Sequence, residues 1–426
     1  MLSDREPNGV TEMSSGKYHE QATACDHCDW VNVLPPLQAG EQHDCARCGH
    51  LIVKCHPNAP QQLLSNGCSA VLMFIMSLCF VFLGFSSQGS HQQITLLDCI
   101  YGLMGEHYIS LGIIVTLSLL VLPVIYLTAV LLTALAMRQG KLRAIHYGLT
   151  HTINALKPWL MVDVFLLGGL VALVKLQSLA EIELGLSFWA FCVFTICLFR
   201  TISFVDKRWI WHCLCGPAPT VAVRSGSALS QGLKGCQYCG ALMTAQTHKC
   251  TRCHHVLHQR QQGSLNNTLA LLFASCVLYL PANLFPIMIT TFLGTSEPST
   301  IMGGVILLWG MKSYLVAGVI FVASILVPVM KILMLFWLCW QIRFGCREYE
   351  KPTQRIYHIT EFIGRWSMVD VFVVAILSAL VQLGAMMNII PGIAAISFAA
   401  VVILTMLAAM SFDSRLIWDK SEEITT

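Results

Sequence analysis

Eight of the nineteen cysteines fall into four Cys-x-x-Cys pairs, and these pairs form two groups, at 25–48 and 236–253. Such a pair lets two thiolates converge on one ion, and two pairs complete a tetrahedral zinc site. The candidate ligands are Cys25, Cys28, Cys45, Cys48, Cys236, Cys239, Cys250 and Cys253. The spacing predicts two small zinc ribbons, each holding one structural Zn2+ that supplies much of the folding free energy of its ribbon.

The same thiols have two alternative uses: iron in place of zinc, or a redox-active dithiol. A catalytic zinc is excluded because four thiolates leave no open coordination position. Ribbons often bind nucleic acid, but Arg252 and Arg260 lie just before an apolar segment, where the positive-inside rule accounts for them. We therefore expect structural metal, no nucleic-acid partner and no enzymatic activity.

Lys331 stands inside the apolar segment "ASILVPVMKILMLFWLCW" at 323–340. It lies twelve residues before Arg343, which is about 18 Å along a helix and places it near the centre of a membrane. A lysine at that depth costs about 2.5–3.5 kcal/mol on insertion scales. The alternative is snorkelling, but the four-carbon stem reaches only about one helical turn. The position predicts a paired or functional lysine.

Two aspartates also stand just inside apolar segments, one in "PWLMVDVF" (158–165) and one in "RWSMVDVF" (365–372). Their structural explanation is that an acid near the start of a helix is stabilised by the helix dipole. Their functional explanation is that they face the bundle interior and exchange protons or pair with Lys331, helped by nearby hydroxyl groups. The expected polar network is Asp163, Ser324, Lys331, Ser367, Asp370 and Thr405.

This network is complete only in the second half of the chain. The equivalent positions of the first half carry Tyr126, Leu160 and Leu198 where the second half has a lysine, a serine and a threonine. We therefore expect one working site in the second half, with Asp163 either reaching across to it or serving as a helix-start acid.

The segment "LPANLFP" at 280–286 predicts a break in an apolar helix. Pro281 and Pro286 each remove a helix hydrogen bond, and Asn283 could cap the freed groups. Exposed backbone at membrane depth is tolerated only where it is buried in protein or lines a cavity. A simple kink is the alternative.

The elements that must position these residues are membrane spans. Only 12% of the residues are charged, against about 25% in a typical soluble chain, and 55% are apolar. The apolar residues gather in runs of about 20, long enough to cross a bilayer as helices. The chain is thus an α-helical multispanning membrane protein. Eight spans are expected, at 68–86, 109–137, 159–178, 185–203, 267–292, 314–341, 366–384 and 389–411.

The chain is also an internal duplication with an offset of about 207 residues. "DKRWIW" (206–211) matches "DSRLIW" (413–418), and each half is a cysteine module followed by four spans. Four spans return the chain to its starting side, so the halves have parallel orientation. The expected parts are a disordered tail (1–20), a first zinc ribbon (21–60), a first four-helix repeat (64–212), a second ribbon (230–262), a second repeat (264–419) and a tail (420–426).

Lysine and arginine counts in the short connections predict the orientation of these spans. The connections 138–158 and 342–365 are rich in basic residues, whereas 87–108 and 385–390 have none. Because basic loops stay on the cytoplasmic side, both termini and both cysteine modules are expected there.

The motifs "YLPANLFPIM", "STIMGGVILLW", "ASILVPVMKI", "GRWSMVDVFV" and "SFDSRLIWD", together with the repeated ribbon-and-four-span pattern, resemble the paraquat-inducible protein A family. The resemblance covers residues 25–419. It implies a bacterial inner-membrane protein that moves lipids between the inner and outer membranes with a periplasmic tunnel protein of the MCE (mammalian cell entry) type, and often with an outer-membrane lipoprotein. It also implies that the polar network drives lipid transfer by protonation.

Two other functions stay open at this point. The chain could be a non-transporting scaffold that anchors the tunnel and senses stress through its ribbons. It could also be a membrane oxidoreductase, although no heme motif Cys-x-x-Cys-His occurs.

Overall fold

The structure is a computed structural model of the whole chain. It describes residues 21–38, 40–87, 90–105, 109–139, 144–176, 181–219, 221–292, 295–310, 312, 314–344, 350–366, 372–373, 376 and 387–419. The predicted tails lie outside these residues, as does most of the predicted span 366–384.

Within the described residues, seven helical segments are long and apolar enough to cross a membrane. They are α1 (Ala59–Cys79), Gly112–Gln139, Tyr147–Leu173, α7 (Leu186–Phe204), α9 (Ser264–Leu284), Ala317–Phe344 and α15 (Ile393–Ser411). Their outward faces are apolar: on α9, Phe273 is 74% exposed and Leu284 is 75% exposed. Such faces are stable in lipid and not in water, so the mostly helical, multi-pass class that the sequence predicts is confirmed.

Three of these seven segments are compound helices. Gly112–Gln139 joins α3 (Ile109–Thr116), a π-helical turn at Leu117–Val121 and α4 (Leu122–Gln139). Ala317–Phe344 likewise joins α11 (Tyr314–Phe321), a π-helical turn at Val322–Leu326 and α12 (Val327–Phe344). Tyr147–Leu173 joins α5 (Ala144–Leu156), a 3-10 turn at Lys157–Trp159 and α6 (Val162–Leu176).

Each π-helical turn stands directly before a proline of the following helix. Pro123 and Pro328 have no N–H to donate to the carbonyl four residues earlier, so the backbone there widens to bonds that skip five residues. The amide of Leu122 donates to the carbonyl of Leu117, and the amide of Val327 donates to that of Val322. The repetition of this device in both halves follows from the duplication of the sequence.

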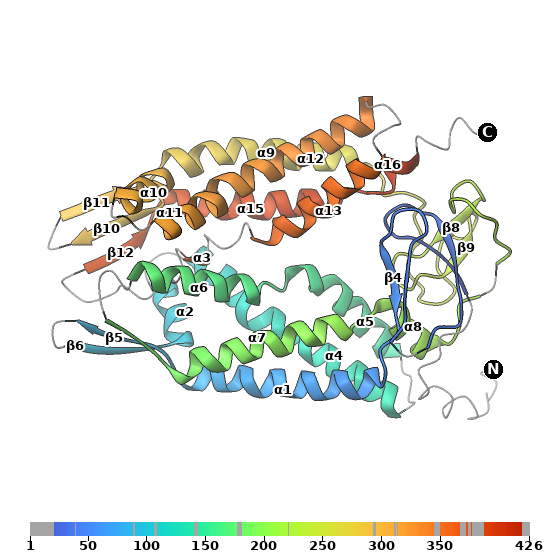
Figure 1. The fold of residues 1–426 in the computed structure, drawn as a ribbon, viewed down its shortest axis with the longest axis horizontal. Coiled ribbons are helices and arrows are strands. Elements are labelled where there is room, and N and C mark those ends of the chain that lie inside the picture. Colours follow the sequence, from blue (N-terminus) through green and yellow to red (C-terminus); the bar gives the residue numbers. More distant parts are fainter. Residues whose placement is uncertain are drawn as a thin grey trace.

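The helices form two layers, one from each half of the chain (Figure 1). Helices α1, α4, α6 and α7 lie in one layer, and α9, α12, α15 and α13 (Glu350–Trp366) lie in the other. The cysteine modules, α8 (Lys207–Cys215) and α16 (Leu416–Asp419) lie together at one end of both layers. This end therefore collects the elements that precede and follow the spans of each half.

The opposite end carries two three-stranded antiparallel sheets (Figure 1). In the first half β5 (Val81–Ser87) pairs with β6 (Ser90–Thr95) and β7 (Glu181–Leu184). In the second half β10 (Met288–Phe292) pairs with β11 (Thr295–Ser299) and β12 (Met387–Pro391). Short helices α2 (Leu96–Gly105) and α10 (Ile301–Gly310) follow the two hairpins.

These sheets correct three of the predicted span boundaries. The predicted spans 68–86, 267–292 and 389–411 extend into β5, β10 and β12, whereas the helices occupy 59–79, 264–284 and 393–411. Segments such as "VFLGFSS" and "MITTF" are apolar enough to prolong a hydropathy run. Hydropathy alone does not separate an apolar strand from the end of an apolar helix.

A glycine joins each sheet to the last span of its half. A Cβ atom at Gly185 would lie 1.9 Å from the carbonyl oxygen of Val81, and one at Gly392 would lie 2.0 Å from that of Pro286. The amide of Gly392 donates to the carbonyl of Ile287 at 2.8 Å. Only glycine permits this approach of two backbones, so the two glycines fix where α7 and α15 begin.

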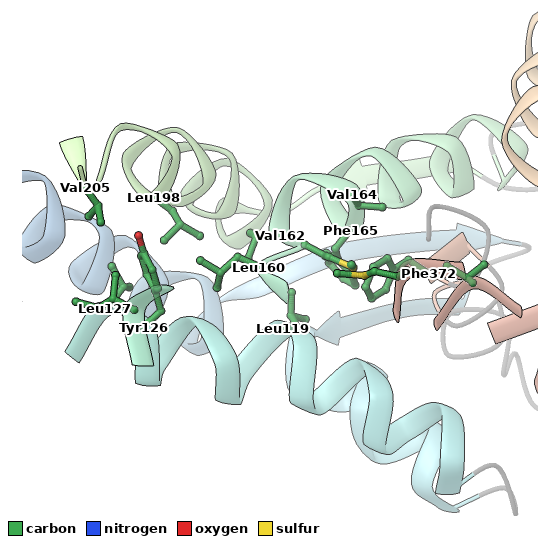
Figure 2. Packing of buried hydrophobic residues seen from close by; sticks show 14 of the residues in the cluster. Leu119, Tyr126, Leu127, Leu160, Val162, Val164, Phe165, Leu198, Val205 and Phe372 are labelled. Atoms are coloured by element: carbon green, nitrogen blue, oxygen red, sulfur yellow. The ribbon is translucent and has the colours of Figure 1, made fainter. Parts of the chain in front are cut away.

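The two layers touch at equivalent positions of the two repeats. Phe165 of α6 meets Phe372 edge to face, with ring centroids 5.5 Å apart (Figure 2). One turn further on, a Cβ atom at Gly169 would lie 3.8 Å from the side chain of Ile376. Phe165 and Phe372 are 207 residues apart, as are Gly169 and Ile376, so equivalent residues of the two repeats pack on one another. This is the arrangement expected at an approximate two-fold axis between parallel repeats.

Candidate functional site

The first cysteine module is built from two hairpins. β1 (Gln21–Ala24) pairs with β2 (Val31–Leu34), and β3 (Gln42–Asp44) pairs with β4 (Leu51–Lys54). The tight turn of each hairpin carries one Cys-x-x-Cys pair, so the two pairs face one another. The thiols of Cys25 and Cys48 lie 3.6 Å apart, and those of Cys28 and Cys45 lie 3.5 Å apart.

The second module repeats this geometry. Its shorter hairpin, β8 (Leu233–Gly235) with β9 (Leu242–Thr244), carries the first of its two pairs. The thiols of Cys236 and Cys253 lie 3.5 Å apart, as do those of Cys239 and Cys250. In both modules all four sulfur atoms lie within 4.8 Å of one another.

The turns that hold these cysteines share one backbone hydrogen bond. The amides of Asp29, Gly49, Gly240 and His254 donate to the carbonyl of the first cysteine of each pair, at 2.8 to 2.9 Å. All four residues have positive φ, from 58° to 73°. Glycine occupies two of these positions, and an aspartate and a histidine occupy the others, so the turn tolerates a side chain.

The four-sulfur clusters have the dimensions of a metal site. A zinc–sulfur bond of about 2.3 Å in a tetrahedron separates the sulfur atoms by about 3.8 Å, close to the spacing found here. Seven of the eight cysteines are buried and Cys48 is partly buried, so bulk water is kept from the sulfurs. Both clusters can therefore bind a metal ion.

The link from each module to the following span is fixed by an aspartate that ends the same half. The carboxylate of Asp206 accepts from the amide of Lys54, and that of Asp413 accepts from the amide of Gln261, both at 3.1 Å. Asp413 also accepts from the guanidinium of Arg415 at 2.7 and 2.9 Å. Burial raises the pKa of Asp413, but these hydrogen bonds outweigh it and hold the pKa below its usual value.

Arg208 connects the first module to both its neighbours. Its buried guanidinium donates to the hydroxyl of Thr23 at 2.5 Å and to the carbonyl of Ala24 at 3.1 Å, and it lies 3.2 Å from the carboxylate of Asp26. Thr23 in turn donates to the carbonyl of Gly240 in the second module at 2.7 Å. The two modules are thus held against one another and against α8.

Each module also packs against the layer of the opposite half. Trp211 of α8, in the first half, is fully buried among the cysteines of the second module. The guanidinium of Arg47, in the first module, lies over the ring of Trp418 of α16, in the second half, at 4.5 Å. Each module therefore contacts both halves of the chain, which the sequence spacing does not reveal.

Three members of the predicted polar network are buried inside spans of the second half. Ser324, in the π-helical turn, and Lys331, in α12, are 0% and 1% exposed. Thr405 of α15 is 1% exposed. The hydroxyl of Ser324 donates to the carbonyl of Ile320 at 2.6 Å, and that of Thr405 donates to the carbonyl of Val402 at 2.9 Å. A lysine enclosed in this way needs polar surroundings if it is to carry charge.

The other three predicted members are Asp163, Ser367 and Asp370. Asp163 is partly buried in the first turn of α6 and lines a small recess with Lys157 and Thr195. Ser367 and Asp370 lie outside the described residues. Their neighbour Phe372 is described, and it packs on Phe165, two residues after Asp163.

The proline segment does not divide α9 into two helices. Pro281 lies inside its last turn, the helix ends at Leu284, and Pro286 stands between the helix and β10. The side-chain amide of Asn283 donates to the carbonyl of Tyr279 at 2.9 Å, and thereby caps the end of the helix. The prolines thus set the transition from helix to sheet.

Sequence reasoning overlooked a group of histidines beside the first module. His27 stands between the first two cysteines, and His50 stands two residues after the fourth. Burial lowers the pKa of His27 to about 3 and that of His50 to about 4. Their positions within the cysteine motifs were a signal that this pair of side chains would lie close together.

The comparisons with known proteins agree with the duplicated architecture. The sequence model of the family described as Paraquat-inducible protein A matches residues 61–214 and again residues 265–422. "Intermembrane transport protein PqiA" of Escherichia coli K12 is 41% identical over 402 residues, which cover 94% of this chain and 96% of that protein. We find no significant match among solved structures.

Two further relatives are more distant but equally complete. "Lipophilic envelope-spanning tunnel protein A" of Escherichia coli K12 is 31% identical over 412 residues, covering 96% of this chain and 93% of that protein. "Probable intermembrane transport protein" of Haemophilus influenzae is 30% identical over 409 residues, covering 93% and 95%. The chain belongs to the paraquat-inducible protein A family.

Proposed function

We propose that this chain is the inner-membrane subunit of an intermembrane lipid transport system, and that it is not an enzyme. It would move lipids between the inner membrane and a periplasmic tunnel protein of the MCE type, with an outer-membrane lipoprotein as a further partner. The names of its relatives support this proposal, since two of them are called intermembrane transport proteins and a third is called a lipophilic envelope-spanning tunnel protein.

The proposed orientation places the cysteine modules and both termini in the cytoplasm. The basic connections 138–158 and 342–365 support it, because they contain most or all of α5 and α13, whose histidines His151 and His358 contact the modules. The two three-stranded sheets would then face the periplasm, where the tunnel protein would meet them. The same proposal includes the predicted domain boundaries: ribbons at 21–60 and 230–262, and four-helix repeats at 64–212 and 264–419.

The two cysteine clusters would hold structural Zn2+. Four thiolates at these distances suit zinc, and small modules with little apolar core gain most of their stability from the metal. The ribbons would then act as rigid clamps, since each of them contacts both halves of the chain.

The observation that carries the transport mechanism is the burial of Lys331 within an apolar span. At this depth the free energies of a charged and a neutral lysine differ by several kcal/mol, so the two forms require different surroundings. Gain or loss of a proton would therefore shift the balance between two arrangements of the helices. In this mechanism a polar network stabilises the charge of Lys331. Its other members are Asp163, Ser324, Ser367, Asp370 and Thr405.

The mechanism is tested by lipid transfer from reconstituted vesicles to the purified tunnel protein. Lys331→Met retains the bulk of the side chain but cannot carry a proton, and we expect it to lower the transfer rate at least tenfold. The matched control is Tyr126→Phe, at the equivalent position of the first half, where we expect an unchanged rate. If Lys331→Met transfers lipid normally, the proton mechanism is wrong.

A further inference from the structure

Three histidines meet at the contact between the first cysteine module and the second half. His27 and His50 come from the module and His358 comes from α13. The ring centroid of His27 lies 3.9 Å from that of His50 and 4.9 Å from that of His358. One nitrogen of each ring lies within 4.8 Å of the others.

This spacing is close to that of a metal site. Nitrogen ligands bind zinc at about 2.0–2.1 Å, so three imidazoles on one tetrahedral ion have their nitrogens about 3.3 Å apart. Binding of an ion would draw the three nitrogens from separations of up to 4.8 Å to this distance. The three side chains are partly buried, so an ion could reach them without opening the fold.

The polar atoms around the histidines support a ligand there. Nδ1 of His27 is buried and has no hydrogen-bond partner within the described part of the chain. An unsatisfied buried nitrogen costs about 1–3 kcal/mol, which a bound ion would recover. The side-chain nitrogen of Gln354 lies 3.2 Å from Nε2 of His358, and the side-chain oxygen of Gln354 accepts from the indole N–H of Trp418 at 3.2 Å, so Gln354 holds the ring of His358 in place.

The second module forms the same arrangement, with one ligand missing, against α5 of the first half. Tyr238, His255 and His151 occupy the positions equivalent to His27, His50 and His358. Their ring centroids lie 3.9, 4.6 and 5.4 Å apart, against 3.9, 4.9 and 5.8 Å in the first module. A tyrosine ring thus packs at this contact as well as a histidine ring does. The histidine at position 27 adds a nitrogen that packing does not require.

We propose that His27, His50 and His358 form a third metal site, which binds one divalent transition-metal ion such as Zn2+. Imidazole nitrogens prefer such ions over calcium or magnesium. Asp26 does not complete the set, because its carboxylate already lies 2.6 Å from Lys207 and 3.2 Å from Arg208. Water would fill the fourth position. The ion would tie the first module to α13, the helix that leads in sequence to Ser367 and Asp370. This site stands independently of the proposed transport function.

The test uses the full-length chain in detergent, Zn2+ as the only added ligand, and metal content measured by mass spectrometry. Three imidazoles bind zinc less tightly than four thiolates, so a mild chelator should remove only the ion at the histidines. We expect wild type to rebind one equivalent of Zn2+ that the chelator removes, and His27→Tyr to rebind none. Both proteins should keep the same chelator-resistant zinc.

The structure offers a matched gain of function. Tyr238→His completes the equivalent set in the second module, and we expect it to add a second removable equivalent. Elution volume and thermal unfolding check that each variant is folded, and His358→Asn serves as a second loss variant. Equal removable zinc in wild type, His27→Tyr and His358→Asn would overturn the proposal, and would show that the three rings only pack.

Discussion

Gly392 is one of two glycines, with Gly185, at which an added methyl group would meet a backbone carbonyl at 2.0 Å or less. Its Cβ would lie 2.0 Å from the carbonyl oxygen of Pro286, whereas ordinary contact begins at 3.4 Å, so the two atoms would be 1.4 Å too close (3.4 minus 2.0 Å). The backbone dihedrals at this residue, φ −88° and ψ 173°, suit alanine as well as glycine. The whole penalty for Gly392→Ala therefore comes from the clash between two backbone segments.

The size of the penalty follows from what must move. The neighbouring atom is a backbone carbonyl that cannot rotate away as a side chain would, so β10 or the start of α15 must shift. Overpacking of this kind costs about 1–3 kcal/mol, and we expect the upper end, about 3 kcal/mol. Gly185→Ala should cost a similar amount, because its Cβ would meet the carbonyl of Val81 at 1.9 Å.

The assay is equilibrium unfolding in detergent, followed by tryptophan fluorescence. The control is Gly318→Ala in α11, where nothing lies within 4 Å of the added methyl. Because alanine favours a helix over glycine, this variant should be about 0.5–1 kcal/mol more stable than wild type. If Gly392→Ala unfolds like wild type while Gly318→Ala behaves as expected, the strand and the helix are further apart than described.

Three other perturbations test the end of the molecule that carries the cysteine modules. Asp413→Asn breaks a buried ion pair with Arg415 and should cost about 3 kcal/mol in the same unfolding assay. Because the pKa of Asp413 is lower in the folded than in the unfolded chain, its carboxylate contributes to the free energy of unfolding above about pH 4, and this contribution fades as the pH falls. The free energy of unfolding of the variant should therefore depend less on pH in the acid range. Cys45→Ser and Cys250→Ser should each lose one of two chelator-resistant zinc ions, measured as metal content; an unchanged content would argue against the cluster concerned. Arg208→Leu should release the first module and raise its rate of limited proteolysis at least tenfold; equal cleavage of variant and wild type would contradict the described contacts.

The sequence predicted those features that depend on local composition. Runs of apolar residues identified the spans, since a bilayer demands about 20 such residues in a row. The Cys-x-x-Cys pairs identified the clusters, because four thiols in two tight turns have few other arrangements. The repeat was visible as well, through matches such as Asp206 with Asp413.

The features that sequence reasoning overlooked depend on contacts between distant segments. β5 and β10 are apolar on their own and become strands by pairing with β7 and β12, about 100 residues later. The packing of each module on the opposite half needs residues such as Arg47 and Trp418 to meet across most of the chain. The histidine group arises from the same contact between the first module and the second half, since His358 is more than 300 residues from His50.

The central claim is that protonation within the membrane drives lipid transfer. The most direct test is the rate at which a labelled phospholipid passes from vesicles containing this chain to the purified tunnel protein, with a pH gradient imposed and then collapsed by an ionophore. We predict rapid transfer under the gradient, and a fall to the rate of protein-free vesicles once the gradient is gone. Transfer that proceeds equally fast in both conditions would contradict the claim.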